Sequence, residues 1–166
     1  LHLVNLPPHH LETLKQSLGD EFDAFAKAYE DKAPVSIRVN EMKKSSNLVD
    51  FDSPPRRAGA QSDKVRWCDS GYYLAQRPSF THDPLFHAGC YYVQEASSMF
   101  LSHVAKTVFP KNVPLKVLDL CAAPGGKSTL LASDLSDDSL LVSNEVIRTR
   151  SHILAENISN WGKANV

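Results

Sequence analysis

The strongest constraint on the fold is a strand–helix–strand–helix order in the second half of the chain. KVLDL (residues 116–120) and SLLVS (residues 139–143) are short apolar segments typical of buried strands. Apolar residues at helical spacing follow each strand, and the second of these helices is expected to end at Gly162. An amphipathic helix over residues 94–108 precedes the first strand. We therefore predict the opening of a parallel α/β sheet with a right-handed crossover.

The first part of the chain has a different pattern. A leucine stripe predicts a helix that stops at Gly19, and Asp20 is expected to cap a second helix that ends at Pro34. Apolar and polar residues alternate over 35–40, which predicts a half-buried strand. Residues 41–64 are polar and are predicted to form a long loop. Short aromatic segments follow, so this part is expected to be a small α+β module.

These patterns divide the chain into two predicted domains. We predict an α+β module over residues 1–92, with a possible RNA-positioning role, and the incomplete start of an α/β domain over residues 93–166. The formal net charge is -1, which excludes a protein held on nucleic acid by bulk positive charge but allows a local basic strip.

The cysteines and the apolar runs limit the remaining classes. The three cysteines lie in dissimilar contexts without a CxxC pair, so neither a disulfide framework nor a metal site is expected. No apolar run reaches the roughly 20 residues needed to span a bilayer, and no signal pattern opens the chain. We expect a cytoplasmic protein with reduced thiols.

The segment DLCAAPGGKS (residues 119–128) lies where ligands bind in parallel sheets, at the carboxyl end of a strand. A phosphate-binding P-loop requires a glycine where this chain has Cys121, and Pro124 would stiffen a loop whose amides must wrap phosphate. The GxGxxG pattern of dinucleotide sites is absent. Both alternatives are therefore disfavoured.

S-adenosylmethionine (SAM) fits the segment better. It has no phosphates and needs small residues beside its methionine part, together with a carboxylate for its ribose hydroxyls. Glu145 follows the second strand, about 20 residues after Gly126, which is the separation expected for a ribose-binding carboxylate. The alternative is that Glu145 only caps the next helix, where the helix dipole favours a negative charge.

The segment DLCAAPGGKS also closely resembles the cofactor motif of the SAM-dependent RNA cytosine-C5 methyltransferase family. That family includes bacterial ribosomal RNA enzymes and eukaryotic nucleolar relatives. SIRVN (residues 36–40), DPLFHAGCYYVQEASSM (residues 83–99) and NISNWGKANV (residues 157–166) resemble it as well. The resemblance covers most of the chain outside residues 41–64, and it implies a Rossmann-like SAM methyltransferase sheet in truncated form.

The resemblance implies roles for particular residues. Arg150 matches a position that often carries a basic cofactor contact, although a solvated helix charge is an equal alternative. Asp119 would orient the loop or approach the cofactor's amino group, and Glu145 would hold the ribose. The residues implied to line the methionine and adenosine of SAM are Cys121, Ala122, Ala123, Pro124, Gly125, Gly126 and Lys127.

No catalytic residue is assigned. The family uses a cysteine that follows threonine, with a second cysteine after proline, and this sequence contains neither pair. Cys121 corresponds to the cofactor-loop cysteine rather than the nucleophile, and Cys68 and Cys90 are expected to be half-buried. We expect an N-terminal fragment that binds SAM weakly and transfers no methyl group. An open edge of its incomplete sheet would invite self-association.

A cytosine in duplex RNA must leave the stack before it reacts, so an RNA-positioning surface is expected. The alternatives to RNA contact are a solvated loop for the charges and a core position for the aromatic residues. A non-catalytic RNA-binding or scaffold protein is the alternative function, but the intact loop and Glu145 favour an enzyme. The candidate RNA contacts are Lys43, Lys44, Arg56, Arg57, Lys64, Arg66, Trp67, Tyr72, Tyr73, Phe80, Tyr91 and Tyr92.

Overall fold

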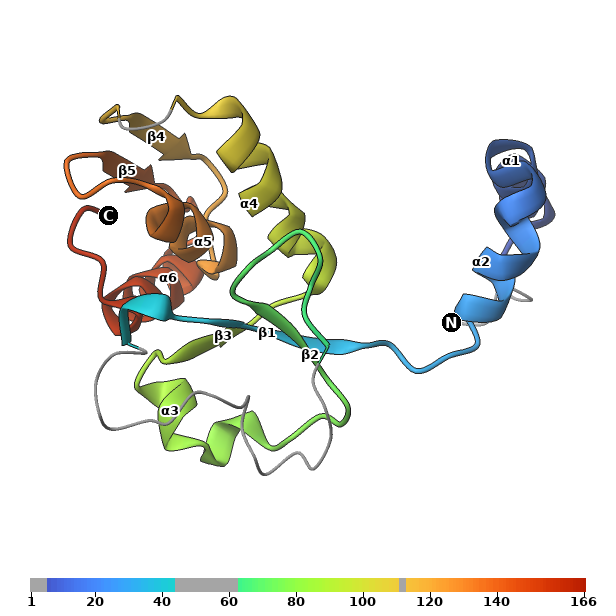
Figure 1. The fold of residues 1–166 in the computed structure, drawn as a ribbon, viewed down its shortest axis with the longest axis horizontal. Coiled ribbons are helices and arrows are strands. Elements are labelled where there is room, and N and C mark those ends of the chain that lie inside the picture. The colour runs from blue at the N-terminus through green and yellow to red at the C-terminus, as the bar shows by residue number, and fades with distance from the viewer. Residues whose placement is uncertain (1–5, 44–62, 111–112) are drawn as a thin grey trace. The chain divides into compact units, whose positions relative to one another are not determined.

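A computed structural model describes residues 6–43, 63–110 and 113–166 (Figure 1). The chain forms two compact units, Leu1–Pro34 and Val35–Val166. This division differs from the predicted boundary between residues 92 and 93, because the strands of the N-terminal part contact the helices that follow them. The assignment of separate functions to residues 1–92 and 93–166 stays a prediction.

The described residues of the first unit form two α-helices joined by a short 3-10 helix. Helix α1 (Pro8–Leu18) begins with a proline in its first turn and ends at Gly19, whose φ is 52°, as predicted from the leucine stripe. A short 3-10 helix, η2 (Gly19–Glu21), leads into α2 (Phe22–Ala28). The prediction that Asp20 caps the second helix is wrong, because Asp20 lies inside η2 and Glu21 is the residue before α2. The second helix also ends before Pro34.

The second unit begins with a three-stranded antiparallel sheet in the order β2–β1–β3. Its strands are β1 (Val35–Val39), β2 (Gly71–Leu74) and β3 (Tyr91–Val93), and Ile37 of β1 is opposite Tyr72 and Val93. The shorter elements around the sheet are η3 (Glu41–Lys43), η5 (Phe80–His82) and α3 (Pro84–His87). One face of the sheet forms an apolar core with Ile37, Leu74, Phe80 and Tyr91.

Strand β1 is buried on both of its faces, so the prediction of a half-buried strand is wrong. Its polar residues Ser36 and Arg38, and Asn40 directly after it, are as inaccessible as the apolar residues between them. The strand alternates as the sequence indicates, but its polar side faces protein rather than water. These polar side chains bond to segments distant in the sequence: Ser36 donates to the carbonyl of Gln94, Arg38 donates to the Gln94 and Thr129 side chains, and Asn40 donates to the carbonyls of Gly89 and Trp161.

The remaining elements follow the predicted order. They are α4 (Ala96–Val108), β4 (Lys116–Asp119), α5 (Gly126–Asp134), β5 (Leu140–Ser143) and α6 (Arg148–Trp161). Strands β4 and β5 pair in parallel, which confirms the α/β prediction. Helix α6 ends at Gly162 with a φ of 85°, as expected for its C-terminal cap.

The two-stranded parallel sheet is covered on one face. Leu141 of β5 packs with residues of α4 and α5, including Ala105 and Ala132. Helices α4 and α5 also reach the other sheet, since Met99 and Leu130 belong to a second apolar cluster against which Tyr73 of β2 packs. Among the described residues, no helix is long and apolar enough to cross a membrane.

Candidate functional site

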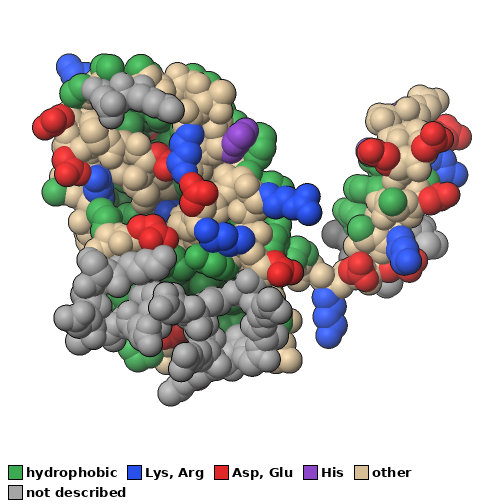
Figure 2. Space-filling view, in the orientation of Figure 1, with side chains coloured by type: hydrophobic (Ala, Val, Ile, Leu, Met, Phe, Trp, Pro, Cys, Tyr) green, Lys and Arg blue, Asp and Glu red, His purple; other side chains and the backbone are tan. Residues whose placement is uncertain are grey.

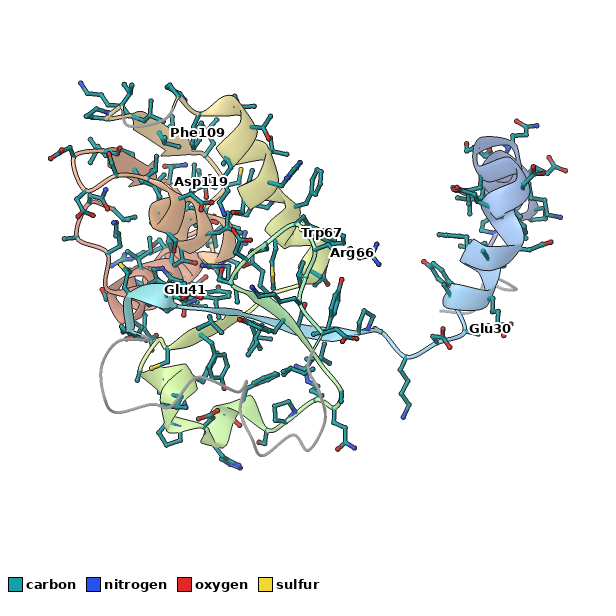
Figure 3. The ribbon with its side chains drawn as sticks, in the orientation of Figure 1. Glu30, Glu41, Arg66, Trp67, Phe109 and Asp119 are labelled. Carbon is teal, nitrogen blue, oxygen red and sulfur yellow. The ribbon has the colours of Figure 1, made fainter. Side chains whose placement is uncertain are left out.

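The candidate site is the loop that connects β4 to α5 beside the end of β5. Asp119 lies at the end of β4 (Figure 3) and fixes both ends of the loop. Its Oδ1 accepts a hydrogen bond from the Cys121 backbone N–H at 3.3 Å, and its Oδ2 accepts one from Ser128 Oγ at 2.7 Å. Asp119 therefore has the loop-orienting contacts that were one of its two expected roles.

The loop is also tied to the end of β5. The Ala122 backbone N–H donates to the carbonyl of Asn144 at 2.9 Å, and Asn144 Nδ2 donates to the carbonyl of Leu120 at 2.9 Å. These reciprocal hydrogen bonds hold the carboxyl ends of the two parallel strands together. The loop is consequently positioned where α/β sheets bind their ligands.

Glu145 lies just beyond β5, and Arg150 joins it to the loop. The Glu145 side chain is only 4% exposed, and its Oε2 is 3.3 Å from Arg150 Nη1. Arg150 Nη2 donates to the carbonyl of Ala123 at 2.7 Å. Glu145 Oε1 accepts a hydrogen bond from the Ile147 backbone N–H at 3.0 Å, at the start of α6. The carboxylate thus supports the start of α6, and the Arg150 side chain connects it to the loop.

Side chains from β3 and α6 hold the middle of the loop by its carbonyl groups. The carbonyl of Pro124 accepts hydrogen bonds from Tyr92 Oη at 3.2 Å and from Asn157 Nδ2 at 2.7 Å. The carbonyl of Gly126 accepts one from Gln94 Nε2 at 3.3 Å. Sequence reasoning assigned no such role to these side chains, although Tyr92, Gln94 and Asn157 all lie within the segments that resemble the family.

Arg38 of β1 is a second residue that the sequence analysis missed. Its side chain donates from Nε to Gln94 Oε1 at 2.9 Å, and from Nη2 to Thr129 Oγ1 at 2.6 Å and to the carbonyl of Gly126 at 3.3 Å. Its guanidinium carbon lies 4.3 Å from the centre of the Trp161 ring. Burial lowers the pKa of Arg38 to about 10, so the guanidinium remains charged at neutral pH.

The small residues of the loop face protein. Ala122 and Ala123 are buried against Leu154 of α6. A Cβ at Gly126 would lie 3.3 Å from the Tyr92 ring, and Gly125 has a φ of 113°, which disfavours any side chain. From the sequence, these residues were expected to allow close approach of a ligand. Packing against β3 and α6 also requires them, and their contact with a cofactor stays a prediction.

The three cysteines differ in exposure. Cys121 is exposed, whereas Cys68 and Cys90 are buried more completely than predicted, at 3% and 7% exposure. Burial raises the pKa of the Cys90 thiol, which opposes formation of a nucleophilic thiolate. In residues 6–43, 63–110 and 113–166, no three His, Cys, Asp or Glu side chains are grouped as metal ligands would be.

The candidate RNA contacts fall into three groups. Lys44, Arg56 and Arg57 lie outside the described residues. Lys43, Phe80 and Tyr91 have structural roles: Lys43 donates to the carbonyls of Ala88 and Asn160, and the two aromatic residues belong to the core. Partly buried Tyr72 packs beside that core, and Tyr92 contacts the loop.

A third group combines exposed basic residues with partly buried aromatic ones. Lys64, Arg66, Trp67 and Tyr73 line a cavity of about 540 Å³ together with Asp63. Arg66 and Trp67 lie beside α4 (Figure 3). On the visible face of the molecule, basic side chains alternate with acidic ones and do not form a continuous strip (Figure 2). Any contact with RNA on this face would therefore be local.

The loop region fits a nucleoside cofactor that lacks phosphates. It combines a carboxylate at the end of β5, suited to ribose hydroxyls, with the start of α5, where the helix dipole favours a carboxylate group. Cys121 and Lys127 are exposed beside this helix start. SAM has both a ribose and a carboxylate, so its groups match these two features.

The chain is similar to known RNA methyltransferases. Residues 6–96 match a family described as the N-terminal domain of 16S rRNA methyltransferase RsmF, and residues 106–166 match the family 16S rRNA methyltransferase RsmB/F. A curated relative, ribosomal RNA small subunit methyltransferase F of Escherichia coli O127:H6 (strain E2348/69 / EPEC), is 33% identical over 172 residues. The match covers 99% of this chain and 35% of the relative, so the chain spans about a third of the relative's length.

Two solved structures have a similar fold. A methyltransferase homolog protein from Pyrococcus horikoshii is 31% identical, with a TM-score of 0.70 over 97% of this chain and 55% of that one. NSun6 from Pyrococcus horikoshii with SFG gives a TM-score of 0.72 over 96% of this chain and 64% of that one. At 16% identity, the second comparison shows the fold alone.

Proposed function

The chain belongs to the RsmB/F family of 16S rRNA methyltransferases, and on this premise we propose that it provides the cofactor loop of an enzyme that methylates C5 of cytosine in ribosomal RNA. SAM would supply the methyl group. The observation that carries the proposal is the link from Glu145 through Arg150 to the carbonyl of Ala123. This link connects the carboxylate proposed to bind the ribose to the loop at the carboxyl ends of two parallel strands.

Each part of the site has a proposed role. Glu145 would accept hydrogen bonds from the ribose hydroxyls, and Arg150 would keep its carboxylate in position. The fold neighbour solved with SFG, a SAM analogue, supports a cofactor of this class. The residues proposed to line the cofactor remain Cys121, Ala122, Ala123, Pro124, Gly125, Gly126 and Lys127.

We propose that these 166 residues bind SAM but do not transfer its methyl group. Cytosine C5 becomes nucleophilic only after a thiolate adds to C6, and the sequence has neither the Thr-Cys nor the Pro-Cys pair of the family. Cys121 is excluded as the nucleophile by its place in the cofactor motif. A methyl-transfer assay with this chain, labelled SAM and 16S rRNA should give no turnover, and measurable turnover would contradict the proposal.

Ribosomal RNA is the proposed partner, and the cytoplasm is accordingly the proposed location. Lys64, Arg66, Trp67 and Tyr73 are the described residues best placed to contact it, because they combine positive charge with partly exposed aromatic rings around one cavity. Replacing Arg66 by Ala should weaken RNA binding and reduce its salt dependence. An unchanged salt dependence would remove this residue from the interface.

Self-association of the chain is also proposed. Leu118, Leu140 and Val142 on the parallel sheet are each about half exposed, and a small sheet with an apolar face tends to pair with another chain. Sedimentation should show a concentration-dependent increase in mass. A strictly monomeric profile at all concentrations would contradict this proposal.

Calorimetric titration of SAM into the chain tests the cofactor role. Replacing Glu145 by Gln should weaken binding about tenfold or more, because the charged acceptor of the ribose hydroxyls is lost. Glu156→Gln is the matched control, since Glu156 is an exposed residue of α6. Equal affinity of the wild type and the Glu145 variant would overturn the role of Glu145. Binding of RNA without any binding of SAM would favour the non-catalytic RNA-binding alternative.

A further inference from the structure

We propose that the antiparallel sheet is a positioning element for the cofactor loop, with Arg38, Tyr92 and Gln94 as its positioning residues. These side chains belong to β1, β3 and the residue after β3, and they hold the loop by its carbonyls. The proposal rests on the proposed binding of SAM at this loop. It adds that the affinity for SAM depends on residues about 30 to 90 positions earlier in the chain.

The burial of Arg38 is energetically unfavourable. Its side chain is 1% exposed, it forms no salt bridge among the described residues, and Nη1 has no hydrogen-bond partner there. A buried cation without a salt bridge is expensive, and an apolar residue of similar size would normally be more stable. The guanidinium donates to the carbonyl of Gly126 and to Thr129 Oγ1. The unfavourable burial of Arg38 therefore serves to hold the first turn of α5 in place.

Gln94 forms hydrogen bonds through both the oxygen and the nitrogen of its side-chain amide. Its Oε1 accepts a hydrogen bond from Arg38 Nε at 2.9 Å, and its Nε2 donates to the carbonyl of Gly126 at 3.3 Å. Arg38 Nη2 donates to the same carbonyl. The amide therefore fixes the orientation of the guanidinium, and both groups converge on one oxygen of the loop.

The loop also fits tightly between β3 and α6. Gly126 lies against the Tyr92 ring, and on the other side Gly125 approaches Asn157, whose Cβ would be 3.4 Å from an added methyl group. Tyr92 and Asn157 both donate to the carbonyl of Pro124. The loop is thus held from two sides by contacts that leave little room for displacement.

Two conservative variants test the proposal in the 166-residue chain. Tyr92→Phe removes one hydroxyl and keeps the ring, and Arg38→Lys keeps the charge but loses the planar fork that reaches three acceptors. Tyr91→Phe is the matched control, because its hydroxyl donates to Asp83 at 2.7 Å on the opposite side of the strand. Thermal unfolding of all variants is measured alongside.

Two readouts are needed. The first is hydrogen exchange of the amides of residues 120–127 without SAM, which reports local opening of the loop. We expect exchange to be about fivefold faster in Tyr92→Phe and about tenfold faster in Arg38→Lys, and unchanged in Tyr91→Phe relative to its global stability. The second is the Kd for SAM, which should rise by similar factors in the first two variants only.

The outcomes separate this proposal from the proposed function. If the wild type binds no SAM, the cofactor proposal fails, while loop exchange still decides the positioning proposal. If loop exchange in Tyr92→Phe and Arg38→Lys follows only the change in global unfolding, the positioning role is overturned. If exchange accelerates locally and the Kd for SAM does not change, the coupling to cofactor affinity is overturned. Should Arg38→Lys fail to fold, Tyr92→Phe decides alone.

Discussion

The two sheets of residues 35–166 differ in which side chains they bury and which they expose to solvent. In the antiparallel sheet, Arg38 of β1 and Asn40 directly after this strand are buried next to apolar residues. The parallel sheet leaves Leu118, Leu140 and Val142 about half exposed on one face. One sheet therefore encloses polar groups, and the other presents apolar groups to solvent.

This difference shows what each sheet has as a neighbour. The polar residues of β1 are buried because backbone carbonyls and a hydroxyl from distant segments satisfy them, including the carbonyl of Trp161 for Asn40. The exposed face of β4 and β5 has no such layer among the described residues. The polar face of the antiparallel sheet is therefore covered by protein. Apolar faces of parallel sheets are ordinarily covered by helices, but one face of β4 and β5 is open.

The largest expected effect comes from the tight junction before β3. Gly89 has a φ of 65°, and an added Cβ would lie 1.9 Å from the backbone oxygen of Asn160 in α6. Gly89→Ala should therefore lower the free energy of unfolding by about 3 kcal/mol or more, measured by urea denaturation. Gly162→Ala is the control, since its φ is also positive but its nearest neighbour is the flexible Lys43 side chain at 3.5 Å.

That control should lose only about 1 kcal/mol, which is the cost of a positive φ without a clash. Equal losses for Gly89→Ala and Gly162→Ala would show that the antiparallel sheet is not fixed against the C-terminal end of α6. The conclusion that the polar face of the antiparallel sheet is covered by protein would then be wrong near Gly89.

A pair of neighbouring residues tests the parallel sheet. Leu141 is 1% exposed in the core under α4 and α5, whereas the next residue, Val142, is 50% exposed. Leu141→Ala should cost about 2–4 kcal/mol, because it leaves a cavity in the core. Val142→Ala should change the free energy of unfolding by no more than about 0.5 kcal/mol. A large loss at Val142 would mean that this face is covered in solution.

The sequence predicted the parallel sheet better than the antiparallel one. Short apolar strands, the glycine-containing loop and Gly162 are local signals, and they sufficed for the parallel pairing and the end of α6. Alternation in β1 identified its two faces correctly, but it carries no information about what covers the polar face. The partners of Arg38 lie 56 and 91 residues further along, so no local pattern could identify them.

The same limit applies to the candidate site. Asp119 and the loop were predicted from their position after a strand, and the structure brings Glu145 and Arg150 together with that loop. The side chains that hold the loop carbonyls are distant in sequence and resemble ordinary strand and helix residues. The available signals were the polar side chain of Gln94 directly after a strand and the place of these residues in segments that resemble the family.

Asn40 tests the polar face of β1 by charge. Its Nδ2 donates to the carbonyls of Gly89 and Trp161, at 3.0 and 2.8 Å. Asn40→Ala should cost about 2 kcal/mol, because two buried carbonyls lose their donor. Asn40→Asp should cost more at neutral pH, since a carboxylate would face two carbonyls, and the loss should shrink as the pH falls and the carboxyl becomes protonated.

Urea denaturation of both variants at several pH values provides the measurement. If Asn40→Asp is as stable as the wild type at neutral pH, water reaches this face and β1 is not buried on both sides. If its stability does not recover on acidification, the introduced carboxyl is not the cause of the loss.

The smallest effect concerns the helices that contact both sheets. Burial raises the pKa of Asp134 at the end of α5, although Ser102 donates a hydrogen bond to it at 2.7 Å and Lys106 lies 3.9 Å away. The folded state therefore takes up a proton at higher pH than the unfolded state. As the pH falls from neutral, the wild type should gain stability relative to Asp134→Asn, in which the amide oxygen can still accept from Ser102.

Asp137 provides the opposite sign close by in the sequence. Its hydrogen bond with Lys163 lowers the pKa of this exposed carboxyl, so the folded state binds its proton less readily than the unfolded state does. Relative to Asp137→Asn, the wild type should lose stability as the pH falls through the range in which the unfolded carboxyl is protonated. Urea denaturation between about pH 7 and pH 3 compares the two pairs. Parallel pH profiles for both pairs would mean that Asp134 is not desolvated. The helices α4 and α5 that cover the parallel sheet would then be more accessible to water than the residues that cover the polar side of β1.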